Sequence, residues 1–174
     1  MNLNADYLIV GSGAIGMAFA DVLVEESNAS LIIIDKYPAP GGHWNHAYPF
    51  VALHQPAAFY GVKSRELSNG KMETSGLNEG YGSLSSLKEI LSYYKAVMEE
   101  QFLPSGRVQY FPNCEYLGDN RFRSLEDGTE HSVEIKKKLV QASHLTTKVP
   151  STHTPNFTTS ESTILNPLMP FRTN

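Results

Sequence analysis

Hydrophobic positions in the first 35 residues form two short apolar runs separated by a stretch with helical spacing. Asp6–Val10 is an apolar run that ends at Gly11, and Leu31–Ile34 is a second run rich in β-branched side chains. Such runs are typical of strands buried on both faces of a parallel sheet. Ala14–Glu26 has the periodicity of a helix. The pattern predicts a βαβ unit with a right-handed crossover.

The predicted first helix is apolar on one side. The side chains that fall on this side are Ile15, Ala18, Phe19, Val22 and Leu23. The acidic residues Asp21, Glu25 and Glu26 fall elsewhere on the helix.

The periodicity disappears between Lys36 and about Gly82, where prolines, glycines and aromatic residues recur. A long segment of this kind inside a compact domain is usually functional or disordered, and aromatic content argues against simple disorder. We therefore predict that residues 36–62 form an ordered loop that faces a cofactor. The more polar residues 63–80 are predicted to lie at the surface.

A second helix is predicted over residues 84–102. Ser86 followed by Glu89 fits a capping box, in which each side chain binds the backbone N–H of the other residue. The helix is expected to end before Pro104 and Gly106. Its apolar stripe contains Leu87, Ile90, Leu91, Tyr94, Val97 and Met98.

Strand patterns dominate the rest of the predicted domain. Residues 107–111 predict a third parallel strand, and residues 139–142 a return to the parallel sheet. Between them, short strands separated by Gly and Asp turns predict a small antiparallel β-meander, at residues 114–118, 121–125 and 131–136. The expected fold class is α/β, a Rossmann-like parallel sheet with helices on both faces and this meander.

The length of 174 residues suits one domain with a real core. We predict that residues 1–150 form an incomplete dinucleotide-binding domain. Residues 151–174, rich in Ser, Thr, Pro and Asn, are expected to form a weakly ordered tail. The net charge of −4 and the single basic run Lys136–Lys138 do not suggest a nucleic-acid partner.

The expected location is cytoplasmic. Cys114 is the only cysteine, so no internal disulfide can form, as is usual in a reducing compartment. No apolar stretch approaches the roughly 20 residues of a membrane span. The first strand begins too close to Met1 to leave room for a signal peptide.

The segment from Gly11 to Gly16 carries the strongest chemical signal. It reads Gly11, Ser12, Gly13, Ala14, Ile15, Gly16, which is the pattern G-x-G-x-x-G between a strand and a helix. In this pattern the first glycine allows a tight turn, the second lets a pyrophosphate approach the backbone, and the third lets the helix pack on the sheet. The helix N-terminus then attracts the phosphates. Ser12 is expected to donate a hydrogen bond to phosphate.

Two further features narrow the expected dinucleotide. Asp35 ends the second strand about 20 residues after the motif, where a carboxylate binds ribose hydroxyls and repels a 2′-phosphate. This favours FAD or NAD over NADP. The turn Gly41–Trp44 then begins a long aromatic loop. Such a loop suits contact with the planar flavin ring, whereas a simple NAD enzyme usually continues quickly into its next helix. FAD is therefore the predicted cofactor, with NAD as the alternative.

These segments resemble flavin-containing monooxygenase-like FAD/NAD(P)-binding oxidoreductases. The similar stretches are D-Y-L-I-V-G-S-G-A-I-G, I-I-I-D-K, P-G-G-H-W, Y-P-F-V-A-L-H-Q-P-A-A-F-Y-G-V, S-G-R-V-Q-Y-F-P and V-P-S-T-H. The resemblance implies that the glycine motif binds the ADP moiety of FAD and that Asp35 binds its ribose. It places Gly42 and Trp44 close to the cofactor. Lys36 and His43, which adjoin these residues, are also predicted to bind the cofactor. The implied chemistry is hydride transfer from NAD(P)H to flavin, often followed by oxygen activation.

The sequence also departs from that family. A second glycine motif for NAD(P)H, a later segment that completes the FAD site, and the F-x-G-x-x-x-H-x-x-x-W fingerprint are absent from the 174 residues. The chain looks like the first half of such an enzyme, which a second chain or segment would complete. A non-catalytic dinucleotide-binding remnant and a plain NAD-binding domain remain alternatives. No catalytic residue is assigned, and scattered histidines such as His43, His46 and His54 do not predict a metal site.

Overall fold

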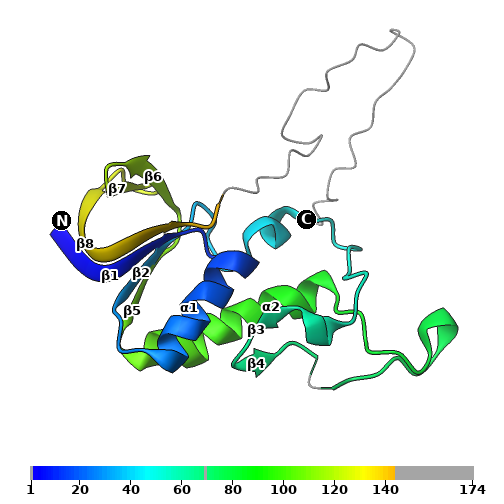
Figure 1. Cartoon of the computed structure of the whole chain (residues 1–174). Coiled ribbons are helices and arrows are strands. Elements are labelled where there is room, and N and C mark those ends of the chain that lie inside the picture. The colour runs from blue at the N-terminus through cyan, green and yellow to red at the C-terminus, as the bar shows by residue number, and fades with distance from the viewer. Residues whose placement is uncertain (1, 69, 144–174) are drawn as a thin grey trace, which may run out of the picture.

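Two α-helices and eight strands form the regular structure of the described residues, 2–68 and 70–143, in the computed structural model (Figure 1). The α-helices are α1 (Ala14–Glu26) and α2 (Leu87–Val97), and α2 continues into a π-helical turn (Met98–Phe102) and a 3-10 turn (Leu103–Ser105). The strands are β1 (Asn2–Val10), β2 (Leu31–Ile34), β3 (Gly61–Val62), β4 (Arg65–Glu66), β5 (Val108–Phe111), β6 (Cys114–Gly118), β7 (Arg121–Ser124) and β8 (Glu130–Gln141). The predicted tail at 151–174 lies outside the described residues.

Six strands form one sheet in the order β5–β2–β1–β8–β7–β6, and β3 and β4 form a separate hairpin. The first four strands in this order, β5, β2, β1 and β8, pair in parallel. The β6–β7 and β7–β8 pairs are antiparallel, as the predicted meander requires. The Rossmann-like α/β fold is therefore confirmed, with β5 as the third parallel strand.

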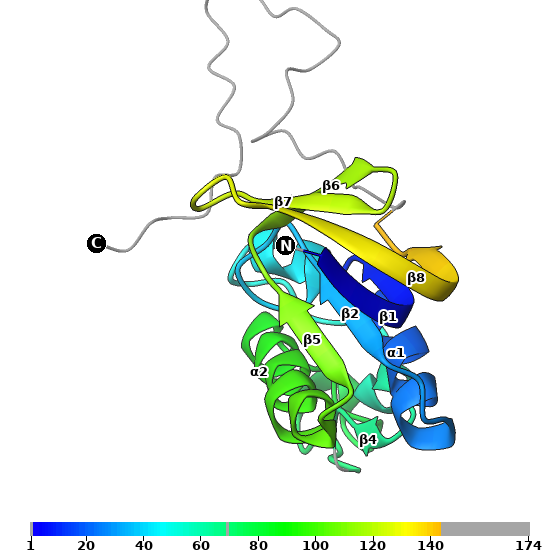
Figure 2. The same ribbon diagram turned by 90° about the vertical axis from the view of Figure 1, so that its left-hand side faces the viewer.

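Both helices cover the same face of the parallel sheet, whereas the sequence suggested helices on both faces. Ile9, Leu31 and Ile33 pack with α1 and α2, while Leu8 and Ile32 on the other face pack with Phe122 of β7. Figure 2 shows the helices on one side of β1, β2 and β5, with β6 and β7 on the other. The prediction failed because β6 follows β5 almost directly, so no residues are left for a crossover helix between them.

The last predicted strands, at 131–136 and 139–142, are one continuous strand, β8. β8 pairs with β7 only at its start and with β1 from Ser132 to Gln141. A bulge in this pairing places Lys136 and Lys137 opposite Asp6. The extra residue accommodates the charged segment within the strand. There, the Nζ of Lys137 lies 3.8 Å from an Asp6 carboxylate oxygen.

Helix α1 turns a different side to the core from the apolar side that the sequence suggested. Its buried residues are Gly16, Met17, Ala20, Asp21 and Val24, whereas Ile15, Phe19 and Val22 are exposed. Because the helix is apolar on both sides, periodicity alone does not select the buried side. The close approach of Gly16 to the sheet selects it. The Asp21 carboxylate can be buried without a large energetic penalty because it accepts hydrogen bonds from the backbone N–H and hydroxyl of Ser64.

The loop over residues 36–62 is anchored to the helix-side core by backbone hydrogen bonds. The Leu53 N–H donates to the Ser85 carbonyl and the Ala57 N–H donates to the Ser83 carbonyl, each at 2.9 Å. Trp44, Leu53 and Ala57 are buried. The loop is ordered, as predicted, and most of the described residues between 63 and 80 are exposed, also as predicted.

The predicted capping box of α2 is confirmed and provides a test of helix stability. The Ser86 hydroxyl accepts from the Glu89 N–H, and the Glu89 carboxylate accepts from the Ser86 N–H at 2.8 Å. Ser86→Ala should lower the free energy of unfolding by about 1 kcal/mol. Ser92→Ala, an exposed position in the same helix, is the matched control and should not destabilise. Equal losses in urea denaturation of both variants would contradict this role of Ser86.

The capping box also predicts a pH dependence. The N–H and hydroxyl of Ser86 lower the pKa of Glu89, because they donate hydrogen bonds to the charged carboxylate. A lowered folded-state pKa contributes stability above the unfolded pKa, and this contribution is lost as the pH falls through the folded value. The stability difference between wild type and Ser86→Ala should therefore shrink in acid. A difference that grew on acidification would contradict this assignment.

Candidate functional site

The G-x-G-x-x-G segment forms the turn from β1 into α1. Gly11 has φ 110°, a conformation that side chains other than glycine rarely adopt, and its N–H donates to the Ile34 carbonyl at 2.8 Å. A Cβ at Gly16 would lie 1.9 Å from the Gly11 carbonyl oxygen. The first and third glycines are therefore needed for the fold itself.

A second glycine turn, Gly41–Gly42, packs directly on the first. The Gly41 N–H donates to the Ser12 carbonyl at 2.9 Å. Gly42 has φ 58°, and a Cβ there would lie 2.8 Å from the Gly13 Cα. Gly13 and Gly42 are each only half-buried, so the two turns together present a backbone surface without side chains.

The N-terminus of α1 opens at this surface without a side-chain cap. Gly13 is the N-cap residue, no side chain in the described part of the chain bonds to the first N–H groups, and the first turn holds no acidic residue. The free N–H groups and the positive end of the helix dipole favour an anion. This arrangement fits the pyrophosphate of a dinucleotide, because both the donors and the close backbone approach are available.

Asp35 ties the glycine turn to the end of β2. Its Oδ2 accepts the Ser12 N–H at 2.5 Å and the Ser12 hydroxyl at 2.7 Å, and its Oδ1 accepts the Tyr37 N–H at 2.9 Å. Ser12 is fully buried and Asp35 is 6% exposed. The Ser12 hydroxyl therefore donates to Asp35, whereas the sequence predicts that it donates to phosphate. Because a carboxylate oxygen can accept about two hydrogen bonds, Oδ1 keeps one acceptor position for a ribose hydroxyl.

The side chain of Tyr110 on β5 reaches the same cluster. Its hydroxyl lies 3.4 Å from the Ser12 hydroxyl, and burial raises its pKa to about 12. The phenol therefore stays protonated at neutral pH. Sequence reasoning did not find Tyr110 or the Tyr37 N–H, because their contacts depend on the pairing of β5 with β2 and on the bend after Asp35.

The side chains predicted beside the cofactor differ in their placement. Trp44 is 7% exposed and belongs to the helix-side core, where its indole N–H donates to the Tyr60 hydroxyl at 2.7 Å. His43 is exposed, lies 5.1 Å from the Trp44 ring, and has a pKa lowered by partial desolvation. Lys36 is exposed with its Nζ 5.0 Å from the Tyr37 ring centroid. Of this predicted set, His43 is the aromatic ring available at the surface of the turn.

Among residues 2–68 and 70–143, no three His, Cys, Asp or Glu side chains lie together in a way that could hold a metal ion. The same part of the chain has no helix that is long and apolar enough to cross a membrane.

Sequence comparison agrees with the class of domain that this geometry defines. Residues 9–59 match the family described as NAD(P)-binding Rossmann-like domain. An uncharacterized protein of Mycobacterium tuberculosis (strain H37Rv) is 51% identical over 149 residues, which is 86% of this chain and 28% of the relative. The chain thus spans little more than a quarter of the length of the curated relatives it matches.

Solved structures share the fold at low sequence identity. A bacillithiol disulfide reductase from Staphylococcus aureus has a TM-score of 0.56 and 13% identity, covering 80% of this chain and 38% of that protein. A cyclohexanone monooxygenase has a TM-score of 0.55 and 20% identity, covering 85% and 28%. The chain carries a dinucleotide-binding Rossmann-like domain. The fold of this domain resembles that of FAD/NAD(P)-binding oxidoreductases.

The contact between the two glycine turns can be tested by paired substitutions. Gly42→Ala adds a Cβ 2.8 Å from Gly13, whereas Gly106 has a similar positive φ of 68° with no atom within 4 Å of its added Cβ. Backbone strain should cost about 1 kcal/mol at either position. Gly42→Ala should lose clearly more free energy of unfolding than Gly106→Ala in urea denaturation. Equal losses would show that the turns do not touch.

Proposed function

We propose that this domain binds the ADP moiety of FAD and is the FAD-binding part of a flavin-dependent oxidoreductase. The observation that carries the proposal is the contact between Gly13 and Gly42 at the uncapped start of α1. Two glycine turns from distant parts of the sequence would have little reason to meet at an open helix N-terminus unless the backbone there were kept accessible.

Each group at the site would have a distinct task. The first N–H groups of α1, at Ala14 and Ile15, would hold the pyrophosphate, and Gly13 would let it approach. The free acceptor position of Asp35 would orient the ribose. The negative charge of Asp35 disfavours a 2′-phosphate, which supports FAD or NAD over NADP at this site.

FAD is favoured over NAD by the turn that follows the ribose site. Gly41 and Gly42 bring backbone against the glycine motif, and the exposed His43 follows directly in the sequence. Partial burial lowers the pKa of His43, which favours the neutral ring, and a neutral planar group suits contact with a flavin. The buried Trp44 would act indirectly, by fixing the turn through its hydrogen bond to Tyr60.

Hydride transfer is proposed for the longer proteins of this type. Bound FAD would supply a carrier that accepts a hydride from NAD(P)H. The residues described here bind and orient the dinucleotide, and no catalytic residue is assigned among them. A cytoplasmic location is part of the same proposal and rests on the single cysteine in the sequence.

NAD is the second candidate, because residues 9–59 match the family described as NAD(P)-binding Rossmann-like domain. The two cofactors share the ADP moiety, so the glycine turns alone do not discriminate between them. Stabilisation by NAD but not by FAD in a thermal melt would favour this candidate.

Gly13→Ala separates binding from folding. Gly13 has φ −78°, and its added Cβ would lie 3.4 Å from Gly42, an ordinary contact. Stability should therefore change by less than about 1 kcal/mol. The methyl group would block approach of the pyrophosphate and weaken FAD binding by at least about tenfold, measured by quenching of flavin fluorescence. Gly106→Ala is the control and should bind normally. Unchanged affinity of Gly13→Ala, or no FAD binding by wild type, would overturn the proposal.

A steady-state assay tests whether the chain turns over alone. We expect no sustained NAD(P)H oxidation by the 174-residue chain with excess FAD, because the described residues supply one dinucleotide site. Sustained consumption, followed at 340 nm, would show that the chain is a complete oxidoreductase and would contradict this expectation.

A further inference from the structure

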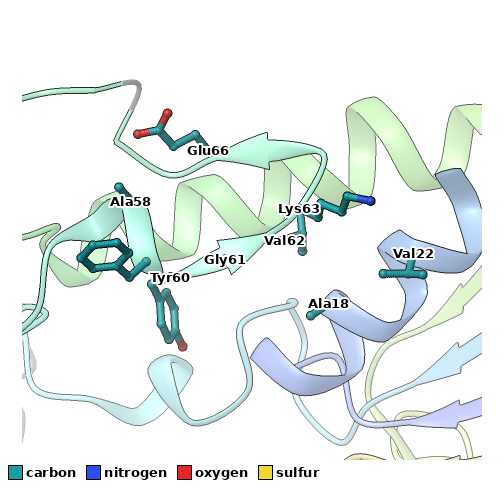
Figure 3. A pocket seen from close by; sticks show the side chains of 9 residues that line it. Ala18, Val22, Ala58, Tyr60, Gly61, Val62, Lys63 and Glu66 are labelled. Atoms are coloured by element: carbon teal, nitrogen blue, oxygen red, sulfur yellow. The ribbon is translucent and has the colours of Figure 1, made fainter.

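Two hollows away from the glycine turns are large enough for a small molecule. The first has a volume of about 360 Å³, and Figure 3 shows it with Val22 of α1 on one side and the β3–β4 hairpin on the other. At this hollow the Lys63 Nζ lies 2.6 Å from a Glu26 carboxylate oxygen. A Glu66 oxygen accepts the Ser68 hydroxyl at 2.9 Å. The charged side chains of this hollow are therefore already engaged and do not favour a charged ligand.

The second hollow, which we call the proline cleft, lies between the bend after β2, helix α2 with its π-helical turn, and strand β5. It has a volume of about 380 Å³, within the range of small-molecule sites. Its apolar lining includes Pro38, Ala39, Pro40, Met98, Leu103 and Tyr110. Proline rings, a thioether and a phenol ring offer flat or polarisable surfaces. The cleft therefore suits an aromatic ring.

Two opposite charges complete the lining of the proline cleft. Lys95 and Glu99 both line it, and the Lys95 Nζ lies 3.9 Å from a Glu99 carboxylate oxygen. Their side chains are 65% and 57% exposed, and within the described part of the chain each is the only ion-pair partner of the other. A ligand with a single charge would meet a like charge here. A ligand that carries both a carboxylate and an ammonium group would satisfy both side chains.

The position of the proline cleft links it to the glycine turns. The hydroxyl of Tyr110 lies 3.4 Å from the Ser12 hydroxyl, which itself donates to Asp35 at 2.7 Å. On the opposite wall the π-helical turn begins at Met98, and π-helical turns occur frequently at functional sites. A ligand that packs on the Tyr110 ring would therefore act on the side chains that hold the first glycine turn.

We propose that the proline cleft binds a free α-amino acid with an aromatic side chain, and that its occupancy strengthens dinucleotide binding. The ring would lie between the prolines and Tyr110, with the carboxylate at Lys95 and the ammonium group at Glu99. By holding Tyr110, the ligand would stabilise the contact between Ser12 and Asp35. The effector role rests on the proposed function, whereas the binding of the amino acid does not.

The site is tested first without FAD, by titration of the ¹⁵N-labelled chain with L-phenylalanine. Saturable amide shift changes are expected at Met98, Leu103 and Tyr110. Phenethylamine and 3-phenylpropionate each lack one charge and should bind at least about threefold more weakly. L-Alanine lacks the ring and should bind at least about tenfold more weakly. No saturable binding of L-phenylalanine at millimolar concentration, or equal binding of 3-phenylpropionate, would overturn the amino-acid site and leave the proposed FAD site standing.

Paired variants locate the site. Lys95→Gln and Glu99→Gln should each weaken L-phenylalanine binding by about threefold or more. Lys88→Gln, an exposed lysine of the same helix outside the cleft lining, should leave it within about twofold. Ala39→Leu fills the cleft and should weaken binding by at least about tenfold, whereas Ala58→Leu, at the first hollow, should not. Equal effects within these pairs would overturn the placement.

The effector role is tested by FAD titration with and without saturating L-phenylalanine. The amino acid should raise FAD affinity by at least about fivefold, and FAD should raise L-phenylalanine affinity by the same factor. Tyr110→Phe removes the hydroxyl beside Ser12 and should bring this factor close to one. An unchanged FAD affinity, or the same factor in Tyr110→Phe, would overturn the effector role. Absence of FAD binding alongside saturable L-phenylalanine binding would overturn both the effector role and the proposed function, and would leave the amino-acid site standing.

Discussion

The backbone contact between Gly13 and Gly42 is the constraint on which the rest of the candidate site depends. A side chain at Gly42 would separate the two turns, since a Cβ built there would lie only 2.8 Å from the Gly13 Cα. The contact fixes where the loop after β2 begins and keeps the start of α1 open. The same contact therefore determines how a ligand can approach the sheet.

Asp35 gives this arrangement its rigidity. Its carboxylate is almost fully buried and accepts three hydrogen bonds from the two segments it joins. Leaving such a group unpaired would be costly, so the glycine turn and the end of β2 are held as one unit. The residue that sequence motifs assign to ribose is also a structural clamp, and the proposed ribose contact would use the remaining acceptor position of Oδ1.

The sequence predicted the βαβ unit, the bounds of α1 and β2, the capping box and the meander, because each depends on local periodicity or turn chemistry. It did not predict that both helices share one face, since that depends on β6 following β5 without a crossover. It also predicted the wrong buried side for α1, because the helix is apolar on two opposite sides. At the site, the glycines and Asp35 were found from their spacing. The contacts of Ser12 with Asp35, Tyr110 with Ser12 and Trp44 with Tyr60 arise only from tertiary packing.

The central claim is that a dinucleotide binds at the junction of the two glycine turns. The most direct measurement is amide chemical-shift mapping of the ¹⁵N-labelled chain during titration with FAD. The account predicts the largest shift changes at Gly13, Ala14, Ile15 and Gly42, with smaller changes near Asp35. Saturable changes confined to other parts of the molecule, or no changes at millimolar FAD and NAD, would contradict it.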